Sequence, residues 1–327
     1  MKLDGLDTSL LIVFILVGIA TFIVGMNMMS SGLKKAAGKG VKSFFRKTKN
    51  NRLANLGVGA GVTAIIQSSA ATSVMAIGFI NAGVMGVTQG VSVMMGAYIG
   101  TTTTGIIASL STFPFSSYLM LLAIVGVILT FFKHEKVKAF GEVLTGLGLL
   151  FFGLSVLSSA FKVPDIKDTV STAFTKISFP LLLMVVGIFV TALVQSSSAT
   201  SGLVIALVGS GAIPFTSALY VVIGGTIGTF ITTVLATIGS NTNAKRAGLI
   251  ALFVKVVGGF LGLAVVWICD ALNVIPNVGE ESAAIVVALF NLIFNIIEQA
   301  ILLPFLTPFE KIANKLIKDK DEEKEYE

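Results

Sequence analysis

The chain carries very little charge. Of its 327 residues, 12% are Asp, Glu, Lys or Arg, about half the share in a soluble protein, and 54% are apolar. Such a chain cannot cover a soluble fold with polar surface, so the sequence predicts an all-α protein that crosses a lipid membrane many times. The net charge of +6 does not indicate a nucleic-acid partner, because the basic residues cluster in short loops between apolar segments.

Histidine and cysteine are almost absent. The single Cys269 excludes an intramolecular disulfide, and the single His134 lies in the charged stretch KHEKVK. This excludes histidine metal sites and most catalytic triads. The many serines raise the possibility of an intramembrane serine hydrolase, but that chemistry needs a base, and we expect Lys255 to lie far from the serine-rich segments. The sequence therefore does not indicate an enzyme.

Seven apolar segments have the length of a membrane-crossing helix, about 20 residues. They are residues 10–29, 84–110, 115–132, 139–160, 213–238, 247–270 and 283–304. With seven crossings, the basic clusters at 34–52, 133–138 and 243–246 all face the same side. Because excess Lys and Arg marks the cytoplasmic side, we expect a plasma (cytoplasmic) membrane protein with its amino terminus outside and its carboxyl terminus in the cytoplasm.

Two further apolar regions, 53–82 and 179–211, are interrupted by polar residues. The interruptions read QSSAATS at 67–73 and QSSSATS at 195–201. Each leaves flanking halves of about 13 residues, or roughly 20 Å of helix, which reach the middle of the membrane and not its far side. The sequence predicts two re-entrant helical hairpins, the first opening to the cytoplasm and the second to the outside.

The chain also contains an internal duplication. Residues 62–108 match the residues 128 positions later at 19 of 47 positions without a gap. Three predicted crossings separate the copies, so the second copy enters the membrane in the opposite sense, which is typical of secondary transporters. We therefore divide the chain into a first inverted repeat (1–138), a second inverted repeat (139–270), a final span (271–306) and a charged cytoplasmic tail (307–327).

In folds of this kind the two broken elements meet near the membrane midplane, so the polar runs should form one site. Their hydroxyls and the exposed N–H groups of the following helices suit a small anion. Oxygens of Gln67 and Gln195 suit a hard cation such as Na⁺, as do two threonine pairs that each share a helix face. These pairs are Thr101 with Thr104 and Thr229 with Thr232. No lysine or arginine is expected near the site, so bound cations would have to supply the counter-charge.

The paired QSSS-type runs, each followed by a G-x-x-I-G-T segment, resemble the type II sodium-dependent phosphate cotransporters and their bacterial relatives over about residues 10–305. The resemblance implies a secondary active transporter that couples sodium entry to phosphate uptake by alternating access. The residues it implies around phosphate are Gln67, Ser68, Ser69, Gln195, Ser196, Ser197 and Ser198. It also implies one sodium ion at Gln67, Thr229 and Thr232, and by symmetry another at Gln195, Thr101 and Thr104.

The sequence departs from that family at three places. Ala70 stands where the third serine of the first run is expected, and Tyr98 and Thr226 stand where many relatives have asparagine. These departures leave open a sodium-coupled symporter of sulfate or a carboxylate, and a passive anion channel is a third alternative. Sodium stoichiometry and oligomeric state are left open as well.

Two charges lie well inside predicted spans, Lys255 and Glu298. Both are expected in the cytoplasmic half of the membrane, where they could pair across neighbouring helices and support the scaffold.

Overall fold

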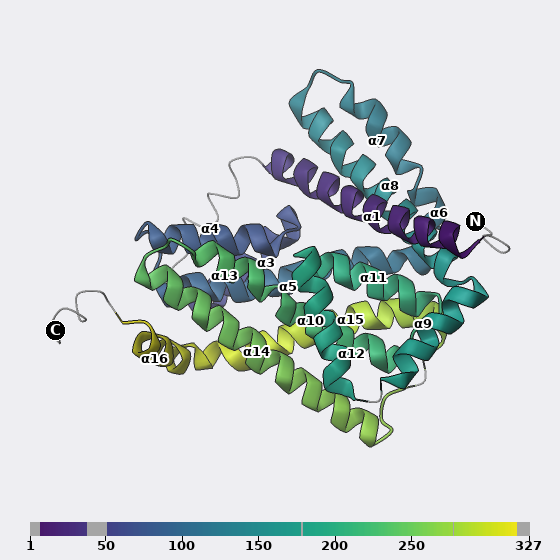
Figure 1. The fold of residues 1–327 in the computed structure, drawn as a ribbon. Coiled ribbons are helices and arrows are strands. Elements are labelled where there is room, and N and C mark those ends of the chain that lie inside the picture. The colour runs from purple at the N-terminus through teal and green to yellow at the C-terminus, as the bar shows by residue number, and fades with distance from the viewer. Residues whose placement is uncertain (1–6, 38–50, 178, 277, 319–327) are drawn as a thin grey trace.

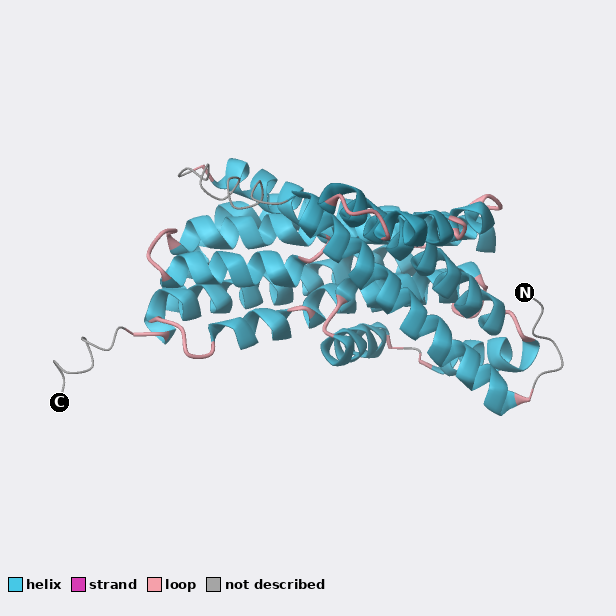
Figure 2. Ribbon diagram, turned by 90° about the horizontal axis from the view of Figure 1, so that it is seen from above, coloured by secondary structure: helices cyan, strands magenta, loops and turns pink. Residues whose placement is uncertain are grey.

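The structure is a computed structural model that describes residues 7–37, 51–177, 179–276 and 278–318. Over these residues it is helical and contains no β-strand (Figure 2). The prediction of an all-α protein is therefore confirmed for the described part of the chain.

Six helical segments in the described ranges are long and apolar enough to cross a membrane. They are formed by α1 (Thr8–Ala37), α5 (Val87–Ser109) with the 3-10 turn Leu110–Thr112, α8 (Glu135–Phe161), α12 (Phe215–Gly228) with α13 (Phe230–Thr237), α14 (Thr242–Ala271), and α15 (Glu280–Leu302) with the turn Leu303–Phe305 and α16 (Leu306–Leu316). They correspond to six of the seven predicted crossings and indicate a multi-pass membrane protein.

The seventh predicted crossing, 115–132, is not among these six and is not one continuous helix. This region forms two short helices, α6 (Ser116–Leu119) and α7 (Leu122–Thr130), which together make an apolar segment of about 22 Å. That length is shorter than a bilayer core of about 30 Å, so the crossing of the membrane by this segment stays a prediction. The chain nevertheless turns back as expected, since Ala123 and Leu129 of α7 lie against Gly148 and Gly141 of α8, in antiparallel order.

Each of the two polar-interrupted regions forms a pair of short helices. The first pair is α3 (Arg52–Ile66) and α4 (Ser69–Asn81), and the second is α10 (Pro180–Val194) and α11 (Ser197–Gly209). Two residues separate the helices of each pair. The predicted helical halves and their breaks are thus present, and the membrane depth of the breaks stays a prediction.

The two copies of the duplication pack in the same way. In the first copy, Gly96 of α5 lies so close to the carbonyl oxygen of Leu56 in α3 that a Cβ atom would overlap it. In the second copy, Gly224 of α12 meets the carbonyl oxygen of Met184 in α10, exactly 128 positions later. Glycine at these positions lets two helix backbones touch, which larger residues would prevent.

Helices α1 and α8 occupy equivalent places in the two copies and pack directly against each other. Gly18 of α1 lies against the backbone of Gly153, and Gly25 lies against that of Gly146. As residue numbers increase along α1, the numbers of the contacted residues in α8 decrease, so the two helices are antiparallel. Together with α7 they form a layer along one side of the molecule (Figure 1).

The hydrophobic core does not divide at the predicted repeat boundaries. One buried cluster joins Phe22 of α1, Leu150 of α8 and Tyr220 of α12, and another joins Val62 of α3 to Ala251 of α14. The boundaries at 138/139 and 270/271 stay predictions about ancestry and topology, because both halves contribute to the same cores.

Segments at the edges of the bundle complete the fold. Helix α9 (Pro164–Lys176) connects α8 to α10, and its Lys167 forms an ion pair of 3.1 Å with Glu280 at the start of α15. Of the predicted tail 307–327, the part up to Leu316 belongs to α16, and residues 319–327 lie outside the described residues. Most of the predicted cytoplasmic loop 34–52 lies outside them as well.

Candidate functional site

The two breaks have nearly the same backbone conformation. Gln67 and Gln195 are both left-handed, with φ/ψ of 53°/33° and 55°/26°. The next residues, Ser68 and Ser196, are extended, and each side-chain oxygen accepts a hydrogen bond from the backbone N–H three residues later at 3.2 Å. A left-handed conformation costs a residue other than glycine about 1 kcal/mol or more. Its presence at both glutamines therefore indicates that the surrounding structure holds these two turns in place, as is common at functional sites.

A buried hydrogen bond closes each break. Thr63 of α3 donates to Thr72 of α4 at 2.7 Å, and Thr191 of α10 donates to Thr200 of α11 at the same distance. In one continuous helix, residues nine apart would be about 13 Å apart along the axis. The bonds therefore require the chain to turn back at each break, so that the two helices of a pair face each other.

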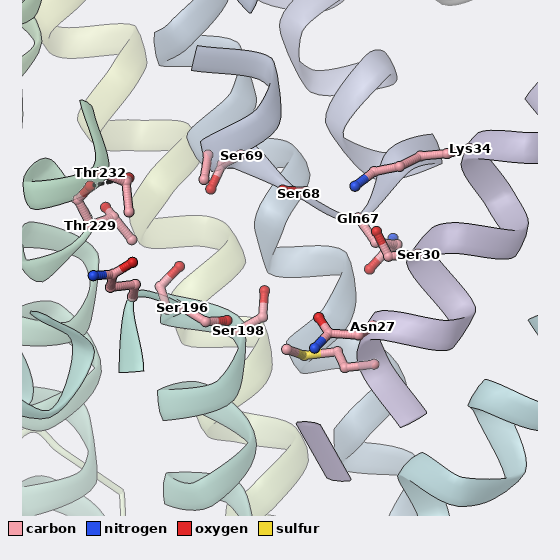
Figure 3. Close-up of a pocket in the computed structure, with 14 residues that line it drawn as sticks. Asn27, Ser30, Lys34, Gln67, Ser68, Ser69, Ser196, Ser198, Thr229 and Thr232 are labelled. Carbon is pink, nitrogen blue, oxygen red and sulfur yellow. Dashed lines mark hydrogen bonds between the residues drawn. The ribbon is translucent and has the colours of Figure 1, made fainter. Parts of the chain in front are cut away.

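A cavity of about 160 Å³ lies between the two breaks. It is lined by Met26, Asn27, Ser30, Lys34, Gln67, Ser68, Ser69, Ala70, Gln195, Ser196, Ser197, Ser198, Thr229 and Thr232. All seven residues predicted to surround the anion line it, and so do Thr229 and Thr232. Figure 3 shows serines of both breaks, the two threonines and the polar residues of α1 around one space. The volume accommodates several water-sized particles.

Gln67 is fixed by hydrogen bonds at both ends of its amide. Its Nε2 donates to the carbonyl oxygen of Ala64, and its Oε1 accepts from Thr104, both at 2.6 Å. Thr104 also accepts a bond of 3.3 Å from Ser198. Thr104, which was predicted to serve a sodium ion with Gln195, thus connects the glutamine of the first break to a serine of the second.

Gln195 differs from its counterpart because its side chain is exposed, although it lines the same cavity. Thr101 lies apart from this cavity and lines a smaller polar cavity beside it. The predicted grouping of Gln195 with Thr101 and Thr104 is therefore not seen as direct contacts in this conformation. Its role in sodium binding stays a prediction.

The helical segment after α11 is interrupted within the candidate site. Thr229 lies between α12 and α13, whereas the equivalent Thr101 lies inside the unbroken α5. The hydroxyl of Thr229 donates to the carbonyl oxygen of Thr226 at 2.7 Å, and that of Thr232 donates to the carbonyl oxygen of Thr229 at 2.8 Å. Both hydroxyl oxygens keep lone pairs that can accept from the cavity.

The expectation that no basic residue lies near the site is wrong. Lys34 lines the main cavity, because α1 continues to Ala37 and not only to residue 29. Figure 3 shows its amine pointing toward Ser68. Lys255 lines the adjoining smaller cavity together with Ser69 and Ser197, so the expectation that it lies far from the serine runs is also wrong. The positions of Lys34 and Lys255 in the sequence do not indicate that either lysine lies close to the serine runs in the fold.

The expected pairing of Lys255 with Glu298 is not present as an ion pair among the described residues. The Lys255 ammonium lies 3.7 Å from the centre of the Tyr98 ring, a cation–π arrangement. Both carboxylate oxygens of Glu298 are buried without a hydrogen-bond partner. Lys255 is 2% exposed, so its side chain is enclosed by the protein.

Sequence reasoning missed polar residues of α1 and α15 near the site. Asn27 and Ser30 of α1 line the main cavity, and Asn291 and Asn295 of α15 line the smaller one. Polar residues inside otherwise apolar helices were the available signal. Asn27 and Ser30 lie in GMNMMSSGLK, a segment that also aligns with the second copy.

The described residues contain no group of three or more His, Cys, Asp or Glu side chains that could hold a metal ion. Any cation at this site would instead be held by hydroxyl, amide and backbone oxygens, which suit a hard ion such as Na⁺.

The helices and the cavity define a multi-pass membrane protein with a polar site between two broken helices. Sequence comparison identifies the particular family: the model of the Na⁺/Pi-cotransporter family matches residues 21–159 and 166–275. The chain belongs to this family, and the resemblance found in its sequence motifs is confirmed.

Individual relatives are more distant. The chain is 28% identical over 300 residues to "Uncharacterized protein YqeW" of Bacillus subtilis, covering 90% of this chain and 95% of that protein. It is 26% identical over 319 residues to "Putative inorganic phosphate export protein YjbB" of Escherichia coli K12, covering 96% of this chain but 57% of that protein. Human "Sodium-dependent phosphate transport protein 2B" is 34% identical over 130 residues, which is 37% of this chain and 18% of that protein. No solved structure matches the chain significantly.

Proposed function

We propose that this protein is a sodium-coupled transporter of inorganic phosphate that works by alternating access, with its substrate site in the cavity between the two breaks. The observation that carries the proposal is the convergence of both QSS runs, 128 residues apart in sequence, on one cavity of about 160 Å³. Membership of the Na⁺/Pi-cotransporter family supports the substrate.

The cavity offers an anion three kinds of stabilisation. Helices α4 and α11 begin at its wall, so their first N–H groups and positive dipole ends lie beside it. The hydroxyls of Ser69 and Ser197 provide neutral donors. Lys34 adds a positive charge at the end of α1. These groups together suit a small, multiply charged anion.

Cations would bind on the opposite side of the cavity, near the interruption between α12 and α13. Thr229 and Thr232 present oxygen lone pairs there, and the interruption lets backbone carbonyl groups turn toward a ligand. We propose one sodium ion at Thr229, Thr232 and the side-chain oxygen of Gln67, and a second cation site near Gln195, Thr101 and Thr104. A bound cation would partly neutralise phosphate and couple the two fluxes.

The equivalent packing of the two copies supports an inverted repeat with two re-entrant hairpins. Two observations favour it: the matching contacts at Gly96 and Gly224, and the antiparallel contact of the equivalent helices α1 and α8. Polar breaks in a membrane are tolerated where they line a water-filled cavity, and these breaks line the polar cavity between them. With residues 115–132 counted as a seventh crossing, this arrangement places the amino terminus outside and the carboxyl terminus in the cytoplasm.

The test is transport of radiolabelled phosphate by the purified protein in proteoliposomes, with a sodium gradient in either direction. We expect accumulation above equilibrium only when sodium runs in the same direction as phosphate. Accumulation without sodium would contradict coupling, and flux that only equilibrates would indicate a passive channel. Unlabelled sulfate and carboxylates are added as competitors, because displacement by one of them at lower concentration than phosphate would indicate a different substrate.

Physiological direction needs a separate measurement, because the E. coli relative is named for phosphate export. Cells that lack their other phosphate transporters are loaded with labelled phosphate, and influx and efflux are measured with and without this protein. We expect net uptake under an inward sodium gradient. Net efflux under the same gradient would make the protein an exporter with another driving force.

A further inference from the structure

A small polar cavity lies beside the main one. Its volume is about 20 Å³, room for about one water molecule or a bare sodium ion. It is lined by residues of α5, α12, α14 and α15 as well as by the breaks. Ser69, Ser197 and Thr229 line both cavities, so the small cavity adjoins the proposed anion site.

The walls of the small cavity favour a cation. Four threonine hydroxyls each donate their proton to a carbonyl oxygen three or four residues earlier in the chain, at 2.7–3.0 Å; they belong to Thr101, Thr102, Thr226 and Thr229. A hydroxyl whose only proton is used in this way can offer just lone pairs to the cavity. Oxygen lone pairs converging on a space for one small particle are typical of a sodium site.

A basic side chain already lies at this cavity. Lys255 of α14 lines it and is 2% exposed, and its ammonium lies 3.7 Å from the centre of the Tyr98 ring. Among the described residues the ammonium forms neither an ion pair nor a hydrogen bond to a protein group. Glu298 acts on it electrostatically from α15 without forming an ion pair. The N–H donors that do not face the Tyr98 ring can serve the cavity and its contents.

We propose that the ammonium of Lys255 is a built-in cation of the transport site and takes the place of one sodium ion. It lies at the cavity lined by Thr101 and Thr229, two predicted sodium ligands, and beside the breaks where the anion would bind. A tethered charge there supplies counter-charge to the anion and repels a second cation from a space that holds one particle. This inference rests on the proposed sodium-coupled function and deepens it.

If the ammonium takes the place of one sodium ion, the protein carries fewer sodium ions per phosphate than its oxygen ligands alone would allow. Removal of the ammonium leaves a small oxygen-lined cavity without its positive charge. We therefore expect Lys255→Ala to bind one more sodium ion per chain and to carry about one more sodium ion per phosphate. Removal of Glu298 as well, in Lys255→Ala/Glu298→Gln, tests whether the cavity oxygens suffice without an excess negative charge.

The experiment measures paired uptake of radioactive sodium and radioactive phosphate into proteoliposomes. Lys167→Ala is the matched control, because it removes a lysine from the surface helix α9, away from both cavities. We expect the sodium-to-phosphate ratio to rise in Lys255→Ala and in the double variant, and to equal the wild-type ratio in Lys167→Ala. An unchanged ratio in a transporting Lys255→Ala protein overturns the inference.

Equilibrium binding of radioactive sodium to the purified protein, without phosphate, decides the question when a variant does not transport. One additional bound sodium ion in Lys255→Ala supports the inference, and equal binding overturns it. If Lys255→Ala does not fold, as judged by size-exclusion chromatography, Lys255→Gln is measured in the same way, because it keeps most of the side-chain volume. A wild type without sodium-dependent phosphate uptake refutes the proposed function, while the binding measurement still tests Lys255 separately.

Discussion

The two breaks share a local sequence and a backbone but differ in their surroundings. Gln67 is buried and hydrogen-bonded to Ala64 and Thr104, whereas Gln195 is exposed. The first break is also tied to α1, because Ser30 donates to the carbonyl oxygen of Ile66 at 2.6 Å. Local sequence therefore decides the turn, and the neighbouring helices decide which of the two glutamines faces water.

The two copies also differ in the helical segments after α4 and α11. Helix α5 continues through Thr101, while its counterpart is interrupted at Thr229. A transporter whose halves are equivalent in sequence must be unequal in any single conformation, since only one side of the site can be open at a time. Under the proposed alternating-access function, the differences between the copies are expected to exchange as the protein changes conformation.

The largest expected effect tests whether the copies really pack alike. Gly96→Ala and Gly224→Ala should each lower stability by about 3 kcal/mol, because the added Cβ meets a backbone carbonyl oxygen that cannot move away. The measurement is thermal denaturation of the purified protein. Gly57→Ala, with open space at its Cβ, is the control and should be neutral or stabilising. Tolerance of either clashing variant would show that the two interfaces are not equivalent.

Substitution of the two glutamines tests whether they differ in stability and in function. Gln67→Ala should lower stability by about 1–3 kcal/mol, because it removes two buried hydrogen bonds, while Gln195→Ala should leave stability unchanged. Both should reduce phosphate transport at least tenfold if both glutamines serve the site. Thermal denaturation and proteoliposome uptake are measured on the same preparations. Equal destabilisation by the two substitutions would contradict the asymmetry of the described conformation.

Thr104 and Thr232 are equivalent positions with different contacts. Thr104→Val removes the bonds to Gln67 and Ser198 and should cost about 1–2 kcal/mol of stability. Thr232→Val removes one bond within its own helix and should cost less than about 0.5 kcal/mol. Both should weaken apparent sodium affinity in uptake assays. An effect of Thr104→Val on stability without any effect on sodium affinity would assign it a structural role.

The smallest effect concerns the charge at the end of α1. Lys34→Gln should weaken phosphate binding about fivefold at low ionic strength, and the difference should fade in high salt because the lysine is exposed. Lys35→Gln is the control, since Lys35 pairs with Glu142 at 2.5 Å and does not line the cavity. A loss of affinity that is independent of salt would mean that Lys34 contacts the anion in a closed, desolvated site.

Much of the molecule could be predicted because hydrophobic runs and the repeat are local patterns. The breaks at Gln67 and Gln195, most of the residues around the main cavity and the six long helical segments follow from the sequence. The prediction of one continuous helix over 115–132 was wrong. The apolar character of this segment indicates burial in lipid or protein, but it does not specify that the helix continues through Met120 and Leu121. Gly126 lets this segment pack closely against α8. The hydrophobic pattern of the segment does not predict that contact.

Composition and duplication are enough to predict a helical membrane protein with two equivalent polar breaks, because both are properties of each segment taken alone. The positions of Lys34 and Lys255 beside those breaks, and the enclosure of Gln67 but not of Gln195, come from the packing of helices. Charge and burial at a site depend on which helices pack around it. That packing comes from contacts such as those of Gly25 with Gly146, between residues far apart in the chain.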